Sequence, residues 1–200
     1  MRVLILAGGK GTRLLPLTKY APKIMMSIHG QPFLYYLIKD YHKHDIVLSV
    51  NYMKEAIKNW CRFTKNYLEF VDEPEFCGTG GAIRMAEPFF HGKHKFAVVN
   101  GDTHISEPLE KIARSHNSKK DLITSVYAKN ILTGERENAG VYILSSGIFE
   151  HLQKPKFFDL EDKLDKLPVK IYESKGSFLD IGSHEGIKYA KKKMFQKETV

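Results

Sequence analysis

The 200-residue sequence has few cysteines and no long apolar run. Its two cysteines, Cys61 and Cys77, are too few for a disulfide framework and form no Cys-x-x-Cys pair, so we expect both to be reduced. No stretch is apolar over the roughly 20 residues that a membrane-spanning helix needs. The N-terminus also shows no apolar segment followed by a small-residue cleavage site. These absences predict a soluble, cytoplasmic protein that has no membrane partner.

Metal clusters and nucleic-acid motifs are also missing from the sequence. The nine histidines have no recognised zinc spacing, and we interpret them as surface residues. The formal net charge is +8, but the lysines are scattered, with local clusters only at Lys119-Lys120 and Lys191-Lys193. Nothing resembles a basic arm or an RNA-binding aromatic motif. We therefore expect no nucleic-acid partner and interpret the charge as solvated, in an enzyme that handles small polyanions.

The sequence does contain a regular alternation of apolar runs and helical periodicity. This alternation predicts βαβ units, and the length predicts one domain over residues 1–200. The expected fold is therefore a single-domain α/β fold with a mixed, mostly parallel sheet flanked by helices. The expected strands are Arg2–Ala7, Ile46–Val50, Tyr67–Val71, Phe96–Val99, Leu122–Tyr127, Gly140–Leu144, Val169–Tyr172 and Ser177–Ile181. The expected helices are Pro32–His42, Met53–Trp60, Thr79–Ala86, Leu109–His116 and Glu185–Met194, with a short helix after Ser145, an acidic amphipathic stretch at Leu160–Leu167 and an irregular segment before Gly140.

A glycine-rich loop follows the first expected strand, and two cations accompany it. Glycines let backbone N–H groups approach an anion closely, and Arg13 and Lys23 add fixed positive charge. A Walker A loop is excluded because Gly11 follows Lys10, and a dinucleotide fingerprint would need glycine where Leu14 stands. We interpret the loop as part of a nucleoside-triphosphate site. The nucleotide-binding residues expected here are Leu6, Ala7, Gly8, Gly9, Gly11 and Thr12.

The stretch LAGGKGTRLLPLTKYAPK resembles the signature of the sugar-1-phosphate nucleotidyltransferases, which combines a glycine-rich turn, Thr-Arg-Leu, Pro-x-Thr and Pro-Lys. The resemblance covers nearly the whole chain and is greatest to the small guanylyltransferases for D-glycero-D-manno-heptose 1-phosphate or mannose 1-phosphate. It implies a Rossmann-like, GT-A-like fold. The implied reaction transfers a nucleotidyl group from an NTP to a sugar 1-phosphate and releases pyrophosphate. Ile24 departs from the pattern, because many members have a second proline there.

Two aspartates complete the catalytic end of the implied site. Asp102 ends a buried strand, at the sheet edge where open α/β folds bind ligands. The resemblance assigns Mg2+ to Asp102 and to Asp180 of the FLDIG segment, and Mg2+ is usually held by one or two carboxylates plus phosphates. In-line attack on the α-phosphorus then needs no protein nucleophile, only positioning and charge stabilisation. The expected catalytic residues are Arg13, which holds the leaving phosphates, Lys23, which holds oxygens near the α-phosphorus, and Asp102.

The segment from Glu73 to Ala82 resembles the part of the family that recognises the base. We expect Glu73, Gly78 and Thr79 to contact the nucleotide. Glu73 is an acceptor-only group that matches the N1–H and N2–H2 donors of guanine, which favours GTP. The alternative is that Glu73 caps the following helix or faces solvent. Uridylyl-, cytidylyl- and thymidylyltransferase activities therefore stay open.

The sugar side is indicated by weaker similarities. Asn138 and Gly140 belong to an N-A-G segment that resembles the family's sugar contact, and Glu161 belongs to a segment similar to S-L-E of heptose-phosphate guanylyltransferases. The family's Glu-Lys pair before N-A-G is missing. The candidate replacements are Arg136 or Lys129 for the lysine and Glu135 or Glu137 for the glutamate. This gap leaves open a catalytically weakened nucleotide-sugar-binding regulatory protein, and a homo-oligomer is also left open.

Overall fold

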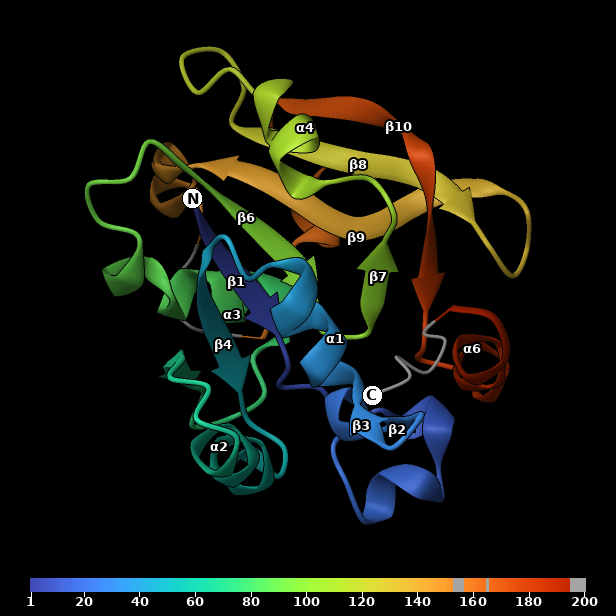
Figure 1. The fold of residues 1–200 in the computed structure, drawn as a ribbon. Coiled ribbons are helices and arrows are strands. Elements are labelled where there is room, and N and C mark those ends of the chain that lie inside the picture. The colour runs from blue at the N-terminus through green and yellow to red at the C-terminus, as the bar shows by residue number, and fades with distance from the viewer. Residues whose placement is uncertain (153–156, 165, 195–200) are drawn as a thin grey trace.

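The computed structural model describes residues 1–152, 157–164 and 166–194, which form a central sheet covered by helices on both faces (Figure 1). The eight-stranded sheet has the order β5-β4-β1-β6-β9-β8-β10-β7. Its strands are β1 (Arg2–Leu6), β4 (Asp45–Val50), β5 (Glu69–Asp72), β6 (Lys95–Asn100), β7 (Thr103–Ile105), β8 (Ile123–Asn130), β9 (Arg136–Ser145) and β10 (Val169–Asp180). A separate small sheet pairs β2 (Ser27–Ile28) with β3 (Gln31–Pro32).

The helices cover the two faces of the sheet. They are α1 (Phe33–Asp40), α2 (Lys54–Phe63), α3 (Gly78–Met85), α4 (Leu109–Arg114), α5 (Glu161–Leu164) and α6 (His184–Tyr189). In Figure 1, α1 and α4 lie in front of the sheet and α3 lies behind it. Among the residues that the structure describes, no helix is long and apolar enough to cross a membrane.

The sheet is mixed, as the alternating pattern predicts. Among the described residues, four of the seven strand pairings in the main sheet are parallel. β9 runs antiparallel to both of its neighbours, β6 and β8, and β7 runs antiparallel to β10. The prediction of a Rossmann-like α/β fold with a mixed, mostly parallel sheet and flanking helices is confirmed.

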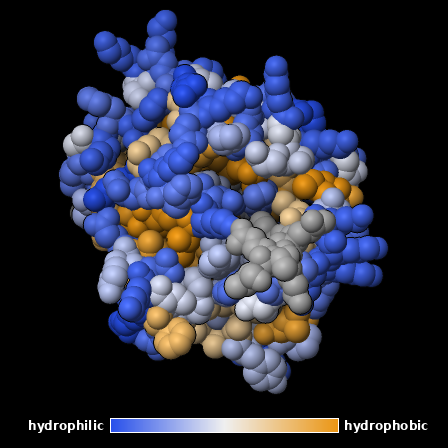
Figure 2. Space-filling model, in the orientation of Figure 1, coloured by the Kyte–Doolittle hydropathy of each residue, from blue (hydrophilic) through white to orange (hydrophobic). Residues whose placement is uncertain are grey.

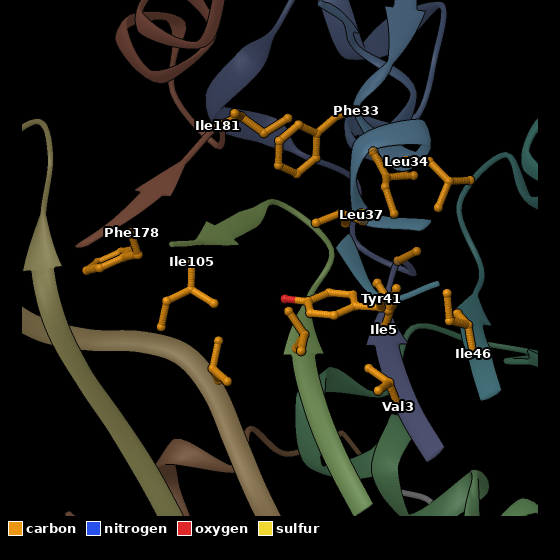
Figure 3. Close-up of a cluster of buried hydrophobic side chains, with 14 of the residues drawn as sticks. Val3, Ile5, Phe33, Leu34, Leu37, Tyr41, Ile46, Ile105, Phe178 and Ile181 are labelled. Atoms are coloured by element: carbon orange, nitrogen blue, oxygen red, sulfur yellow. The ribbon is translucent and has the colours of Figure 1, made fainter. Parts of the chain in front are cut away.

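Two apolar clusters fill the two sides of the sheet, because successive residues of a strand point to opposite faces. On β1, Val3 and Ile5 belong to the cluster under α1 and α4, whereas Leu4 belongs to the cluster under α3. Figure 3 shows Val3 and Ile5 with Phe33, Leu37 and other side chains of the first cluster. Burial on both faces explains why this strand is a continuous apolar run in the sequence.

The outer surface is mainly polar. Figure 2 shows hydrophilic side chains over most of one face, with apolar residues in separate patches. Large apolar side chains that stay exposed include Phe63 and Tyr67, near the end of α2. Single exposed apolar residues of this kind are normal on folded proteins.

The segment before Gly140 differs from its predicted irregular structure. β8 continues to Asn130 and β9 begins at Arg136, so the two form a long antiparallel hairpin. The two predicted strands near the C-terminus are likewise one strand, β10, with a register shift between Glu173 and Ser177. Strand pairing depends on main-chain hydrogen bonds, and these can form between segments whose charged side chains point to solvent. The polar composition of the two segments therefore gave no sign that the strands extend through them.

Candidate active site

A cavity of about 260 Å3 lies at the carboxyl edge of β1 and β6. The parallel pairing of β5, β4, β1 and β6 brings the loop after β1, the loop after β5 and the residues after β6 to the same edge of the sheet. The lining of the cavity contains predicted residues from all three segments. They are Leu6, Ala7, Gly8, Gly9, Arg13, Lys23, Glu73, Gly78, Thr79 and Asp102, together with the unpredicted Ile24, Phe76, Ala82, Asn100 and Gly101.

The remaining predicted residues lie outside the cavity lining. Gly11 packs against Lys23, and Thr12 is exposed at the start of a short 3-10 helix. Asp180 adjoins the charged end of the cavity, where it meets Arg13. Asn138, Gly140 and Glu161 form a separate group beside the cavity, and we describe it below.

Lys23 and Asp102 form an ion pair at one end of the cavity, with the Lys23 ammonium donating to Oδ2 of Asp102. Both side chains are largely buried. Asp102 follows β6, and Lys23 begins a short 3-10 helix whose Ile24 is part of the core. The lysine therefore reaches the sheet edge from a separately anchored loop. An ammonium group has three donors, so two remain for other oxygens.

Asp180 lies next to Asp102 and forms the second ion pair of the site. Its Oδ2 is 3.6 Å from Nη2 of the largely exposed Arg13. A Cβ atom on Gly182 would lie 2.7 Å from Oδ1 of Asp180, 2.9 Å from Nη2 of Arg13 and 3.1 Å from Oδ2 of Asp102. The three charged groups thus surround one point, and only glycine leaves that point open.

The two carboxylates affect each other electrostatically. Burial, together with the negative charge of Asp102, raises the pKa of Asp180 to about 6. The N–H of Gly182 and the charges of Lys23 and Arg13 act in the opposite direction. Two neighbouring carboxylates repel one another unless a positive charge lies between or beside them. The arrangement therefore suits a bound cation or a substrate that brings one.

Glu73 also lines the cavity, with its carboxylate beside Gly8, and it is almost completely buried. Oε1 accepts a hydrogen bond from the Ser49 hydroxyl at 2.8 Å, and Oε2 accepts one from the Cys77 thiol at 3.2 Å. Burial, with the hydrogen bond and charge of Glu73, raises the pKa of Cys77 to about 12, so the thiol stays protonated as a donor. The alternative that Glu73 faces solvent is wrong, because its exposed fraction is 2%.

The three predicted sugar contacts lie close together. The Asn138 amide donates to the Tyr142 hydroxyl at 2.8 Å, and that hydroxyl donates to Oε1 of Glu161 at 2.7 Å. The N–H of Gly140 donates to Oδ1 of Asn138 at 2.9 Å. Thr79, on the cavity wall, donates to Oε2 of Glu161 at 2.9 Å. Hydrogen bonds therefore connect the group of Asn138, Gly140 and Glu161, which we call the sugar group, to Thr79 on the cavity wall.

Arg136, a candidate replacement for the missing lysine, is engaged elsewhere. Its guanidinium donates twice to Oε2 of Glu173, at 2.8 and 2.5 Å, and once to the carbonyl of Ser174. Glu137 accepts a hydrogen bond from the Asn130 amide at 2.5 Å. The Arg136 bonds tie the β8–β9 hairpin to β10, and the Glu137 bond links β8 to β9. Neither residue lines the cavity.

Four of the unpredicted lining residues, Ile24, Ala82, Asn100 and Gly101, lie in or next to segments already singled out in the sequence, whereas Phe76 and Tyr142 were missed because no motif position marks them. Tyr142 lies within an expected strand, where an aromatic residue indicates only a side chain of the hydrophobic core. Phe76 lines the cavity and is 43% exposed, and an exposed aromatic between Glu73 and Gly78 was the available signal. Within the described ranges, no group of three or more histidine, cysteine or acidic side chains is arranged to hold a metal ion. A metal at this site would need substrate oxygens to complete its coordination.

Comparison with known families gives one clear match. A family model described as nucleotidyl transferase matches residues 2–131. The chain is 32% identical over 185 residues to bifunctional protein GlmU of Methanococcus aeolicus, covering 90% of this chain and 42% of that protein. It is 29% identical over 214 residues to D-glycero-alpha-D-manno-heptose 1-phosphate guanylyltransferase of Campylobacter jejuni, covering 92% of this chain and 96% of that protein. The chain thus spans less than half of the first relative and nearly all of the second.

Among solved structures, the chain is similar to HddC from Yersinia pseudotuberculosis. The TM-score is 0.81 and the identity is 31%, over 97% of this chain and 99% of HddC. A further crystal structure shows HddC in complex with GMP-PN. The similarity in fold therefore extends over both the cavity and the neighbouring sugar group.

Proposed function

We propose that this chain, which belongs to the nucleotidyl transferase family, transfers GMP from GTP to a heptose or mannose 1-phosphate and releases pyrophosphate. The observation that carries the proposal is the meeting of two cations and two acids at one end of the cavity. This is the charge pattern that phosphoryl chemistry needs, since catalysis there consists mainly of positioning and electrostatic stabilisation. A cytoplasmic location and a single domain over residues 1–200 stay predictions.

The lining of the cavity combines a charged cluster with apolar side chains. Arg13, Lys23 and Asp102 form the charged cluster, where the triphosphate belongs. Leu6, Ala82 and Phe76 add apolar surface suited to a base, and Glu73 adds one buried acceptor. A nucleotide whose triphosphate lies at the charged cluster has its α-phosphate near the acids.

The chain's own residues then do the following. Arg13 holds the leaving pyrophosphate, and Lys23 donates its remaining N–H groups to oxygens near the α-phosphorus. An oxygen of the sugar 1-phosphate attacks that phosphorus in line, and the bond to the pyrophosphate oxygen breaks. The attacking group is a phosphate already ionised at neutral pH, so no general base is required.

Asp102 and Asp180 fit the requirements of Mg2+. Both present carboxylate oxygens to one point, and burial together with the charge of Asp102 raises the pKa of Asp180. Mg2+ prefers such oxygens and usually takes its remaining ligands from phosphates and water. When bound, Mg2+ would neutralise charge on the phosphates of both substrates.

The base preference for GTP rests on Glu73. Ser49 and Cys77 fix its carboxylate, and neither is a cation, so the group keeps acceptor capacity for donors of a ligand. Guanine has two adjacent donors, whereas uracil and thymine place acceptors beside one donor. The names of the heptose 1-phosphate guanylyltransferase and of the HddC complex with GMP-PN support the same choice.

Pyrophosphate release tests the proposal directly. The full chain is incubated in Mg2+ with GTP, UTP, CTP or dTTP and with D-glycero-D-manno-heptose 1-phosphate or mannose 1-phosphate, with the Asp102→Asn variant as the control. Release that depends on GTP, on one sugar 1-phosphate and on Asp102 is expected. A preference for UTP would contradict the role of Glu73. Nucleotide binding without release for any pair would instead favour a regulatory protein.

A further inference from the structure

A continuous chain of side-chain hydrogen bonds runs from the cavity wall to the sugar group. It connects Thr79, Glu161, Tyr142 and Asn138, with distances of 2.9, 2.7 and 2.8 Å between successive polar atoms. We call these four residues the relay. At its far end, Asn138 accepts from the N–H of Gly140.

Both ends of the relay reach residues that line the cavity. Thr79 lines it directly, and Gly140 packs against Asn100, which also lines it. A Cβ atom on Gly140 would lie 2.4 Å from Nδ2 of Asn100, so the two strands β6 and β9 are in close contact at this point. The relay therefore runs alongside the cavity, next to the end of β6 that leads into Asp102.

Tyr142 is the centre of the relay and its most buried member. Its exposed fraction is 1%, its ring lies in the core beneath α3, and only its hydroxyl takes part in polar contacts. That hydroxyl accepts from Asn138 and donates to Glu161. Since the ring is immobilised by packing, the hydroxyl is a fixed reference point for both partners.

Glu161 depends on the relay for its orientation. The residue is exposed at the start of α5, and its two oxygens are held by the hydroxyls of Tyr142 and Thr79. The backbone around it has anchors outside the relay: Leu160 is fully buried, and Phe158 packs on Gly80. Removal of the Tyr142 hydroxyl therefore frees one oxygen of the carboxylate without unfolding the segment.

From this geometry we infer that Tyr142 is a positioning residue for the sugar 1-phosphate. It holds the Glu161 carboxylate and the Asn138 amide where they bind the hydroxyls of the acceptor sugar, at a fixed place relative to the nucleotide. Each of the two groups keeps free lone pairs or N–H donors after its relay bonds are counted. The inference rests on the proposed function. It adds Tyr142, which no motif position marks, to the residues that determine how the sugar 1-phosphate binds.

The test compares Tyr142→Phe with Tyr41→Phe in the full chain. Tyr41 is also a buried tyrosine, but it lies in the cluster on the opposite face, so its variant makes the same chemical change away from the relay. For Tyr142→Phe we expect KM for the sugar 1-phosphate to rise about tenfold, the scale of one lost hydrogen bond to a charged group. KM for the NTP should stay within about twofold, and Tyr41→Phe should change neither constant.

Two results would overturn the inference. One is an unchanged KM for the sugar 1-phosphate in Tyr142→Phe. The other is an equal loss for both substrates together with a lower melting temperature, which a purely structural residue would give. The pair Thr79→Ser and Thr79→Val gives a second route if Tyr142→Phe folds poorly. Serine keeps the hydroxyl bonded to Glu161 and should preserve KM for the sugar 1-phosphate, whereas valine should raise it.

Failure of the proposed function is a separate result. It would appear in the wild-type chain as no pyrophosphate release with any pair of substrates. In that case, calorimetric titration of the wild type and Tyr142→Phe with mannose 1-phosphate and with heptose 1-phosphate still tests the relay. Weaker binding by the variant than by the wild type supports the inference. Equal binding by the two, or no binding by the wild type, overturns it.

Discussion

Asp180 and Thr103 face each other in the antiparallel pairing of β10 with β7. This register places Asp180 beside Asp102, the residue just before Thr103, and the N–H of Ile181 donates to the carbonyl of Asp102 at 2.9 Å. The pairing of β10 with β7 therefore holds Asp180 against the short turn between β6 and β7 that carries Asp102. Strand pairing of this kind is a rigid support for a catalytic group.

Replacement of Asp180 by asparagine separates the catalytic and the structural effects of that residue. We expect kcat to fall by about 100-fold or more, as for the loss of one electrostatic stabiliser. Burial and Asp102 raise the pKa of Asp180 to about 6, so its ionised form disfavours the folded state. Without metal, the variant should therefore be more stable than wild type at pH 7, by about 1 to 3 kcal/mol.

The pH dependence of this stability difference is a further check. Because the folded pKa is raised, wild type loses stability as the pH rises from about 4 towards 6. The difference between Asp180→Asn and wild type in urea unfolding should grow over this window. A difference of the same size at pH 4 and at pH 7 would contradict the raised pKa of Asp180.

Replacement of Arg13 or Lys23 should reduce turnover strongly. Each supplies positive charge at the end of the cavity assigned to phosphate, so Arg13→Gln and Lys23→Met should each lower kcat by about 100-fold. Lys10 is the matched control, because it is exposed in the same loop and does not line the cavity. A similar loss in Lys10→Met would show that total loop charge, rather than position, matters.

Replacement of Glu73 by glutamine should weaken base selection. The amide replaces one acceptor with a donor, so the preference for GTP over UTP in kcat/KM should fall about tenfold or more. Glu75→Gln is the control, since Glu75 is exposed in the same loop and does not line the cavity. An unchanged preference in Glu73→Gln would place base recognition on other residues.

Phe76 should contribute to nucleotide affinity by stacking on the base. It lines the cavity, is 43% exposed, and packs its ring against that of Phe157 with a centroid distance of 5.8 Å. Phe76→Ala should weaken GTP binding by about tenfold, since stacking on an aromatic is worth about 1–3 kcal/mol per base. Phe63→Ala removes an exposed ring that does not line the cavity and should leave titrations unchanged.

His116 should make the fold sensitive to acid. It is buried between Thr124 and Ser145, and burial lowers its pKa to about 4. Because the unfolded chain takes up this proton near pH 6.5, stability should fall by up to about 3 kcal/mol as the pH drops from 6.5 to 4. Urea unfolding of His116→Gln should lack this component, whereas the exposed His91→Gln should retain it.

The nucleotide side of the site was predictable because its residues lie in short, contiguous motifs. Gly8 and Asp102 follow strands that are apolar on both faces, and parallel strands bring their carboxyl ends to one edge. The sugar side was less predictable. The hairpin of β8 and β9 is held by main-chain hydrogen bonds, and many of its side chains are charged. Neither the spacing of apolar residues nor the polarity of the segment therefore indicated a strand. Tyr142 acts through a single hydroxyl on an otherwise ordinary core ring, which no sequence pattern distinguishes.

The reversed direction of β9 has a consequence for how substrate preference can change. On one side of it, parallel strands carry the loops that surround the cavity; on the other, β8, β9 and β10 carry the sugar group and Asp180. Under the proposed function, the contacts to the base and the triphosphate lie mainly in the earlier block of the chain, and the contacts to the sugar lie in the later block, which also carries Asp180. Exchange of the later block between homologues is a route to new acceptors with an unaltered donor.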